Sequence, residues 1–182
     1  MYGLVNKAIQ DLICEKFGED KWIEIKKLSG FEDDFFVGLQ SYPDSLTYTL
    51  VKNASKVLGA DASVVMEAFG EYWILYTASE GYGDMLELAG DNFVDFLNNL
   101  DMLHNRVAGI MPGLIPPQFS TRNETSNSIE LEYRSQREGL TPMVIGLTRG
   151  LCKRFELKEY KISHIQQKDS NHDCHVFKIE WQ

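Results

Sequence analysis

The segment DNFVDFLNNLDMLHNRVAGIMP, residues 91–112, decides how this chain is built. Its apolar residues recur every three or four positions, which is the spacing of one face of an α-helix. The resulting stripe consists of Phe93, Phe96, Leu97, Leu100, Leu103, His104 and Val107. Gly109 and Pro112 are placed to end the helix. His104 therefore stands where the helical period calls for an apolar side chain, and this position needs a chemical explanation.

Four more segments upstream have helical spacing. They are residues 2–17, 20–28, 45–58 and 61–76, and the last of them is unusually aromatic. Gly18 and Gly59 stand where the first and the third of these helices are expected to end. The acidic and aromatic stretch FEDDFF at 31–36 is predicted to be a loop.

Downstream of Pro117 the pattern changes to alternation of apolar and polar residues, which indicates β-strands. The alternating positions are Ile129, Leu131 and Tyr133, then Ile162 and His164, then Phe177, Ile179 and Trp181. A helical segment at 143–155 interrupts them, and the short strand connections favour antiparallel pairing. We expect an α+β protein of one domain, 1–182, with a helical part of about 1–60 and a helix-plus-sheet part of about 61–182.

The composition argues against several classes of function. Of the 182 residues 43% are hydrophobic, which is enough for a continuous core. The formal net charge of −9 argues against nucleic acid as a partner, because binding to phosphates needs clustered Lys and Arg. We find no glycine-rich phosphate loop, nucleophile elbow or paired catalytic carboxylates, so the chain is not expected to be an enzyme.

Two features concern the cellular compartment. Residues 1–18 mix apolar with charged side chains and lack the apolar core of a signal peptide or a membrane span. Cys14, Cys152 and Cys174 are odd in number, widely spaced and without a CxxC pair, which argues against disulfide bonds. We expect three buried thiols in a cytoplasmic protein that does not bind membranes.

A single histidine on an apolar helix face is more often a buried, hydrogen-bonded side chain than a metal ligand. A second feature bears on His104, namely the segment YRSQR at 133–137. If a strand runs through it, Tyr133, Ser135 and Arg137 share one face and form a row of hydrogen-bond donors suited to two carboxylates. Such a row is also typical of a solvated strand face, so the residues alone leave both interpretations open.

Three motifs, in their order and spacing, resemble the H-NOX family of haem nitric oxide/oxygen-binding domains. They are LDMLHNRV at 100–107, PP at 116–117 and YRSQR at 133–137. The likeness extends through MYGLVN at 1–6, EAFGEYW at 67–73 and GYGDML at 81–86 to the final CHVFKIEWQ, so it covers essentially the whole chain. The family is related to the haem domain of soluble guanylate cyclase. The resemblance implies a stand-alone bacterial protein with haem b between a helical half and a half built on a four-stranded antiparallel sheet.

The resemblance also assigns roles to the residues singled out above. It makes His104 the proximal axial ligand of the haem iron, in agreement with its anomalous place on the apolar stripe. Tyr133, Ser135 and Arg137 would bind the haem propionates, Arg137 through charge-assisted and bidentate hydrogen bonds.

Three further matches are less specific. Pro117 corresponds to a proline that presses on the porphyrin and distorts it, although a loop proline is equally consistent with the sequence. Asp44 either pairs with Arg137 across the two halves or, as is commoner just before a helix, caps that helix. His164 and Cys174 resemble two of the four ligands of a zinc site in some relatives, and two are too few, so no zinc is expected.

The side of the haem opposite His104 bears on the choice of gas. Family members that hold dioxygen have a tyrosine in the C-terminal helix, and counting back from Gly146 its place is taken here by Met143. Bound dioxygen depends on such a hydrogen bond more than nitric oxide does, so stable oxygen binding is not expected. Trp73 matches another distal position, and its indole N–H is the one feature that favours dioxygen. Apolar wall positions are matched by Val5, Ile9 and Leu147.

The implied function is that of a gas sensor for nitric oxide and carbon monoxide. Nitric oxide binds ferrous haem and breaks the bond to His104, which frees the helix around it to move. A separate protein reads the movement, in bacterial relatives often a histidine kinase or a cyclic-di-GMP enzyme. Two other classes stay open, namely an O2-binding haem protein and a haem-free interaction module.

Overall fold

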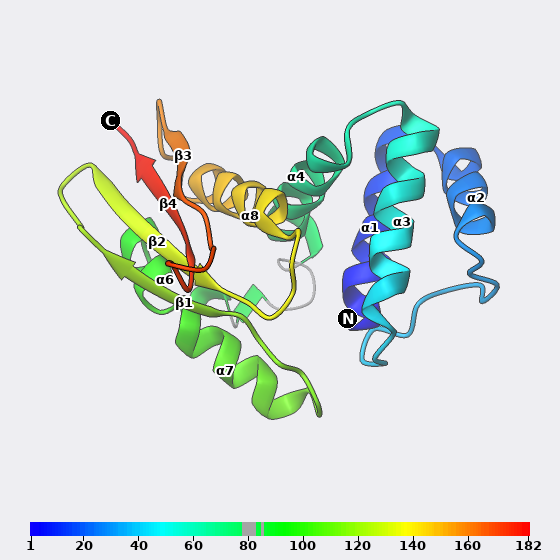
Figure 1. The fold of residues 1–182 in the computed structure, drawn as a ribbon, viewed down its shortest axis with the longest axis horizontal. Coiled ribbons are helices and arrows are strands. Elements are labelled where there is room, and N and C mark those ends of the chain that lie inside the picture. Colours follow the sequence, from blue (N-terminus) through cyan, green and yellow to red (C-terminus); the bar gives the residue numbers. More distant parts are fainter. Residues whose placement is uncertain (78–82, 85) are drawn as a thin grey trace.

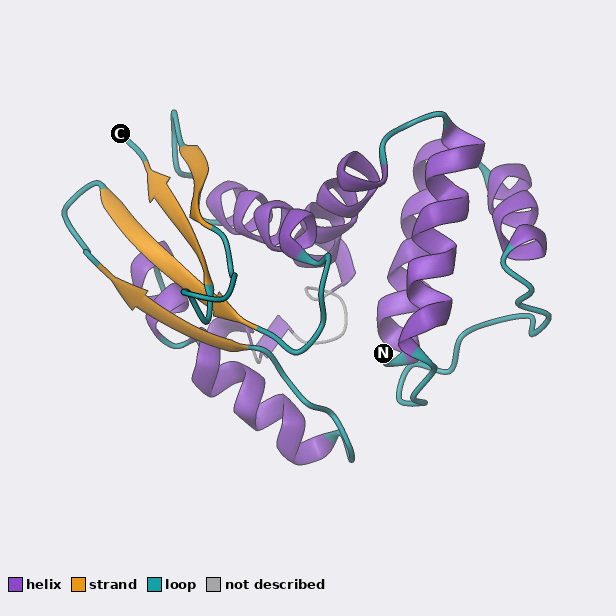
Figure 2. Ribbon diagram, in the orientation of Figure 1, coloured by secondary structure: helices purple, strands orange, loops and turns teal. Residues whose placement is uncertain are grey.

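The computed structural model describes residues 1–77, 83, 84 and 86–182 of the chain. Three helices, α1 (Gly3–Phe17), α2 (Glu19–Leu28) and α3 (Asp44–Leu58), lie together on one side of the molecule. A β-sheet lies on the opposite side, and two helices, α4 (Ala62–Tyr72) and α8 (Thr141–Arg154), cross between them (Figures 1 and 2). The α+β class expected from the sequence is confirmed.

The helical half has a core of its own. Its fully buried side chains include Ile9 and Ile13 of α1, Ile25 of α2 and Leu50 of α3. Phe69 of α4 belongs to the same cluster, so α4 packs on the helical half as well as on α8. The loop predicted at 31–36 is present, and the stacked rings of Phe31 and Phe36 fix it against the helices. This half is therefore a packed body that presents the start of α1 toward the sheet half.

The sequence predicted one helix over the apolar stripe at 93–107, but the structure has two helices there. The difference determines which helix carries His104. The first is α6 (Phe93–Asn98) and the second is α7 (Leu100–Ile110), with the break at Asn99. Asn99 leaves the helical conformation, with ψ near 1°, and its side-chain amide donates to the carbonyl of Ala89 at 2.9 Å. A polar side chain that bonds a loop carbonyl competes with helix continuation at that residue. His104 thus sits on a separate helix of 11 residues.

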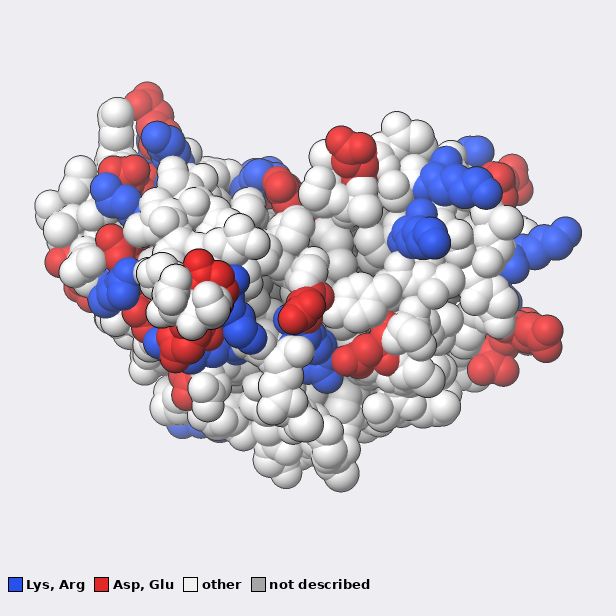
Figure 3. Space-filling model, viewed as in Figure 1, with Lys and Arg blue, Asp and Glu red and all other residues white. Residues whose placement is uncertain are grey.

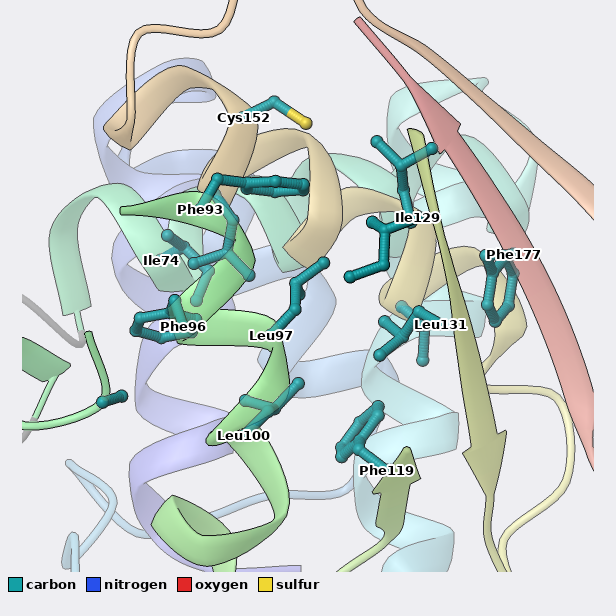
Figure 4. Close-up of a cluster of buried hydrophobic side chains, with 14 of the residues drawn as sticks. Ile74, Phe93, Phe96, Leu97, Leu100, Phe119, Ile129, Leu131, Cys152 and Phe177 are labelled. Atoms are coloured by element: carbon teal, nitrogen blue, oxygen red, sulfur yellow. The ribbon is translucent and has the colours of Figure 1, made fainter. Parts of the chain in front are cut away.

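The sheet has four antiparallel strands in the order β1-β2-β4-β3. They are β1 (Gln118–Arg122), β2 (Ser128–Arg134), β3 (Lys161–Gln166) and β4 (His175–Glu180). The alternation expected at 129–133 is confirmed, and Ile129, Leu131 and Tyr133 point into the core. Figure 4 shows Leu97 and Leu100 directed at Ile129 and Leu131, so α6 and α7 cover one face of the sheet.

Glycines allow α4 and α8 to cross in direct backbone contact. A Cβ atom added at Gly146 of α8 would lie 2.0 Å from the carbonyl oxygen of Glu67, and one added at Gly70 of α4 would lie 2.3 Å from that of Met143. An ion pair between Arg149 and Glu67, 2.8 Å long, crosses the same contact. Since neither glycine position can accept a side chain without movement, the crossing of α4 and α8 is closely fixed.

Charges of both signs are interspersed on the face shown in Figure 3, where Lys and Arg do not form a continuous patch. Within the described part of the chain, no helix combines the length and the hydropathy that crossing a bilayer requires. Cys152 and Cys174 are buried thiols as expected, whereas Cys14 is only partly buried.

Candidate functional site

A cavity of about 290 Å³ lies between the start of α1 and the sheet half. Its walls come from α1, from the single π-helical turn η1 (Trp73–Thr77) that follows α4, and from α7, α8 and the inner face of the sheet. The walls are mainly apolar and include Leu4, Val5, Leu103, Val107, Phe119 and Leu147. Ligand pockets in proteins are typically cavities of this character with a few placed polar groups.

His104 of α7 lines this cavity. Its Nδ1 lies 2.8 Å from the carbonyl oxygen of Leu100, one helical turn earlier. A carbonyl can only accept a hydrogen bond, so Nδ1 carries the proton and the lone pair is on Nε2. Nε2 has no hydrogen-bond partner among the described residues. Burial lowers the pKa of His104, against the opposing effects of the Leu100 carbonyl and the Asp101 charge, and this favours the neutral ring that a metal requires.

Arg137 and Tyr133 form a polar part of the same cavity. The Nε of Arg137 donates to Oδ2 of Asp44 at 2.8 Å, and its Nη1 donates to the carbonyl of Ile115 at 3.0 Å. Nη2 has no partner among the described residues, so one face of the guanidinium remains for an anion. Burial raises the pKa of Tyr133, which therefore stays a neutral donor. The bidentate contact expected of Arg137 would require it to leave one of its present acceptors.

The strand expected to carry Tyr133, Ser135 and Arg137 on one face is corrected by the structure. Strand β2 ends at Arg134, because β1 and β4 offer it no partner beyond Gln118 and His175. Ser135 is in a turn, in which its hydroxyl accepts the backbone N–H of Arg137 at 3.0 Å. Ser135 does not itself line the cavity, whereas Tyr133 and Arg137 do.

Asp44 takes the less common of its two predicted roles. It pairs with Arg137, 93 residues away, and also with the amino group of Met1. The cap of α3 is Pro43, and no side-chain hydrogen bond caps that helix, so the interpretation of Asp44 as a capping residue is wrong. Burial alone would raise the pKa of Asp44, but the Met1 amine and Arg137 outweigh it and lower the pKa. The pair ties α3 of the helical half to the turn after β2.

The predicted wall residues mostly converge on the cavity. Val5, Trp73, Met143, Leu147 and Pro117 line it. Ile9 does not, because it is one helical turn further along α1 and fully buried in the core of the helical half. Tyr2 and Phe119 are among the lining residues that the sequence analysis missed. Phe119 is the direct register partner of Tyr133 on the neighbouring strand, so knowledge of that pairing would have found it.

The surface around His164 and Cys174 is separate from the cavity. His164 Nε2 lies 3.2 Å from Nδ1 of His175 on the adjacent strand. No group of three or more His, Cys, Asp or Glu side chains that could hold a metal ion is found in the described part of the chain.

The donor set fits one kind of occupant. An apolar slot with a single unprotonated imidazole nitrogen in its wall suits a flat hydrophobic group that carries a metal ion. A guanidinium nitrogen and a phenol nearby suit acidic groups on the same occupant. The cavity thus offers one imidazole nitrogen to a metal ion and two polar side chains to acidic groups of the same occupant.

Comparisons with known proteins identify the family of this chain. The profile of the Haem-NO-binding (HNOB) family matches residues 2–164, and the chain belongs to that family. The chain is 31% identical to soluble guanylate cyclase gcy-31 of Caenorhabditis elegans over 97% of its own length. It spans 25% of that relative, about a quarter of the cyclase.

Solved structures share the whole fold. An H-NOX protein from S. oneidensis in the Fe(II)NO ligation state has a TM-score of 0.88 at 23% identity, covering 100% of this chain and 99% of the other. An oxygen-binding H-NOX domain in its oxygen complex has a TM-score of 0.84 at 22% identity, covering 100% and 95%. Both complexes have one fold, so the fold alone does not choose between the two gases. The family is one of haem-binding, gas-sensing domains.

Proposed function

We propose that residues 1–182 form one domain that holds haem b in the cavity and senses nitric oxide. His104 binds the iron through Nε2, and the bond from Nδ1 to the Leu100 carbonyl fixes the ring for that role. Tyr133 and the Nη2 of Arg137, which line the cavity, would bind the haem propionates, and Pro117 would contact the macrocycle from the cavity wall. The observation that carries the proposal is the free Nε2 of His104 at the wall of an apolar cavity.

The haem would supply a ferrous iron that takes up nitric oxide or carbon monoxide. The distal walls of the cavity contain few donors for such a ligand. Met143 has none, and the hydroxyl of Thr148, which also lines the cavity, donates to the Val144 carbonyl at 2.8 Å. This arrangement supports selectivity for nitric oxide over dioxygen, because dioxygen depends more strongly on a distal hydrogen bond.

The mobile part of the sensor is α7. His104 would be the link between α7 and the haem iron, and loss of that link on binding of nitric oxide would free α7 to shift relative to the sheet. A separate protein of the histidine kinase or cyclic-di-GMP type reads the shift. We place the protein in the cytoplasm, where its three thiols stay reduced.

Absorption spectra of the purified protein, reduced and held under argon, air, carbon monoxide and nitric oxide, test the proposal. Wild-type protein is expected to contain haem, to bind carbon monoxide, to show with nitric oxide the spectrum of a haem without axial histidine, and to form no lasting oxygen complex in air. His104→Ala should lose the histidine-ligated spectrum under argon. His164→Ala, a histidine of the exposed strand β3, is the matched control and should keep it. Unchanged spectra of His104→Ala, or colourless wild-type protein, would contradict the proposal.

The position of Trp73 supports an alternative function, that of an O2-binding haem protein. Its ring lines the cavity and packs edge-on against Phe69 at 6.3 Å. A stable oxygen complex that disappears in Trp73→Phe would establish this alternative.

A further inference from the structure

Tyr2 joins the two halves at the end of the helix that carries His104. Its hydroxyl donates to the carbonyl oxygen of Pro112 at 2.6 Å, across 110 residues of sequence. The backbone of Tyr2 is anchored in the helical half, where it bridges Ser41. Its side chain is buried and lines the cavity. The hydroxyl therefore reaches from a fixed body to the segment that directly follows α7.

The receiving segment has few other restraints. Of residues 109–117 only Met111 is buried, and the large side chains of Ile110 and Ile115 are 59% and 54% exposed. Figures 1 and 3 show that α7 ends at the lower edge of the molecule, where the surface carries no charged side chains. With so little apolar burial, hydrogen bonds account for much of what holds this segment in place.

Two of these hydrogen bonds come from outside the segment. Tyr2 binds the Pro112 carbonyl, and the Nη1 of Arg137 binds the Ile115 carbonyl at 3.0 Å. Pro112 has no N–H, so its carbonyl is the one backbone group through which that residue can be held. The two bonds thus hold the link between α7 and Pro117 at two points.

We propose that Tyr2 is a positioning residue for His104. This inference rests on the proposed function, since it concerns how the release of His104 is opposed. The Tyr2 hydroxyl holds the end of α7 against the helical half while His104 is bound to iron. The movement of α7 requires the hydrogen bond between Tyr2 and the Pro112 carbonyl to break. The strength of this hydrogen bond therefore contributes to the barrier against release of His104 from the iron.

The test is Tyr2→Phe, which removes the hydroxyl and keeps the ring in the cavity wall. Its matched control is Tyr48→Phe. Tyr48, on α3, also donates from the helical half to a carbonyl of the other half, that of Glu138 at 2.9 Å, but this acceptor lies outside residues 109–117. Both variants are compared with the wild type as haem-loaded, reduced proteins.

The first readout is amide hydrogen exchange before any gas is added. In Tyr2→Phe, the amides of Met111 and Leu114, which bond to Val107 and Met111 carbonyls, should exchange about 2- to 12-fold faster, and in Tyr48→Phe they should not. The second readout is the rate at which nitric oxide removes the axial histidine, which should rise by a similar factor in Tyr2→Phe alone. A shifted iron–histidine stretching frequency in Tyr2→Phe would show that the hydroxyl acts on His104 and not merely on stability.

Suppose that the protein binds haem through His104 but that Tyr2→Phe and Tyr48→Phe have the same exchange rates and the same release rates. That result would overturn the role of Tyr2 and leave the proposed function standing. Loss of the proposed function would look different, because His104→Ala would then leave the iron–histidine stretching band of the reduced protein unchanged.

Discussion

The two walls of the cavity are built differently. The wall formed by α4, η1 and α8 rests on a crossing in which glycine backbones touch and an ion pair joins Glu67 to Arg149. The wall that carries His104 is a helix that is separated from its predecessor at Asn99 and is followed by a largely exposed segment. The contrast shows where a signal can arise, because the loss of a ligand from α7 acts on a helix whose following segment is largely exposed.

The largest effect is expected at the fixed wall. Gly146→Ala places a Cβ 2.0 Å from the Glu67 carbonyl, which forces α4 and α8 apart. The free energy of unfolding should fall by about 3 kcal/mol, as for other overpacked cores. Gly109→Ala is the matched control on α7, where a Cβ meets no atom within 4 Å. Because alanine favours helix, that variant should gain about 0.5–1 kcal/mol. Chemical denaturation measures both, and equal effects would remove the distinction between the walls.

The next effect concerns the donors of the fixed wall. Met143→Tyr adds a phenol to a wall position whose native side chain has no donor. A hydrogen bond to bound dioxygen should slow its dissociation by about tenfold or more, since such bonds to a partly charged acceptor are worth about 1.5–3 kcal/mol. Met143→Phe adds the ring without the hydroxyl and is the control. Stopped-flow mixing with oxygenated buffer gives the rates, and similar rates in both variants would refute the role assigned to this position.

The smallest effect is expected where the two halves are joined at the surface. Asp44→Asn removes the charge that pairs with Arg137 and with the amino group of Met1. The side chains are 25% and 38% exposed, so the pair should contribute about 0.5 kcal/mol or less after allowing for solvent screening. Because folding lowers the pKa of Asp44, this contribution is present above the unfolded pKa of about 3.9 and is lost as the pH falls through the folded value. Denaturation at pH 7 and pH 3 should show the difference only at pH 7. A difference that persists at pH 3 would contradict the ion pair as its cause.

The sequence was most informative where local chemistry decides structure. Gly18 and Gly59 have positive φ angles of 92° and 63° and follow the last residues of α1 and α3, as the spacing predicted. His104 stood out because its side chain interrupts an apolar period, and the structure places it at the cavity. Helical periodicity and turn residues are local signals, so they can be recognised without knowing which residues pack against them in the fold.

The features that were missed depend on distant residues. The break at Asn99 is tied to a bond with the Ala89 carbonyl, and β2 ends at Arg134 because its neighbours offer no further partners. The pairing of Asp44 with Arg137 and the bond from Tyr2 to Pro112 span 93 and 110 residues. Residue spacing within one segment cannot predict contacts between distant segments. The contact between Asp44 and Arg137 was expected only because of the family resemblance.

Amide hydrogen exchange of the reduced, haem-loaded protein before and after addition of nitric oxide tests the central claim most directly. The account predicts faster exchange across α7 and residues 111–115 once His104 is released, with no change at the crossing of α4 and α8. Unchanged exchange in α7, or an equal increase in both walls, would contradict the claim that His104 transmits the signal through α7.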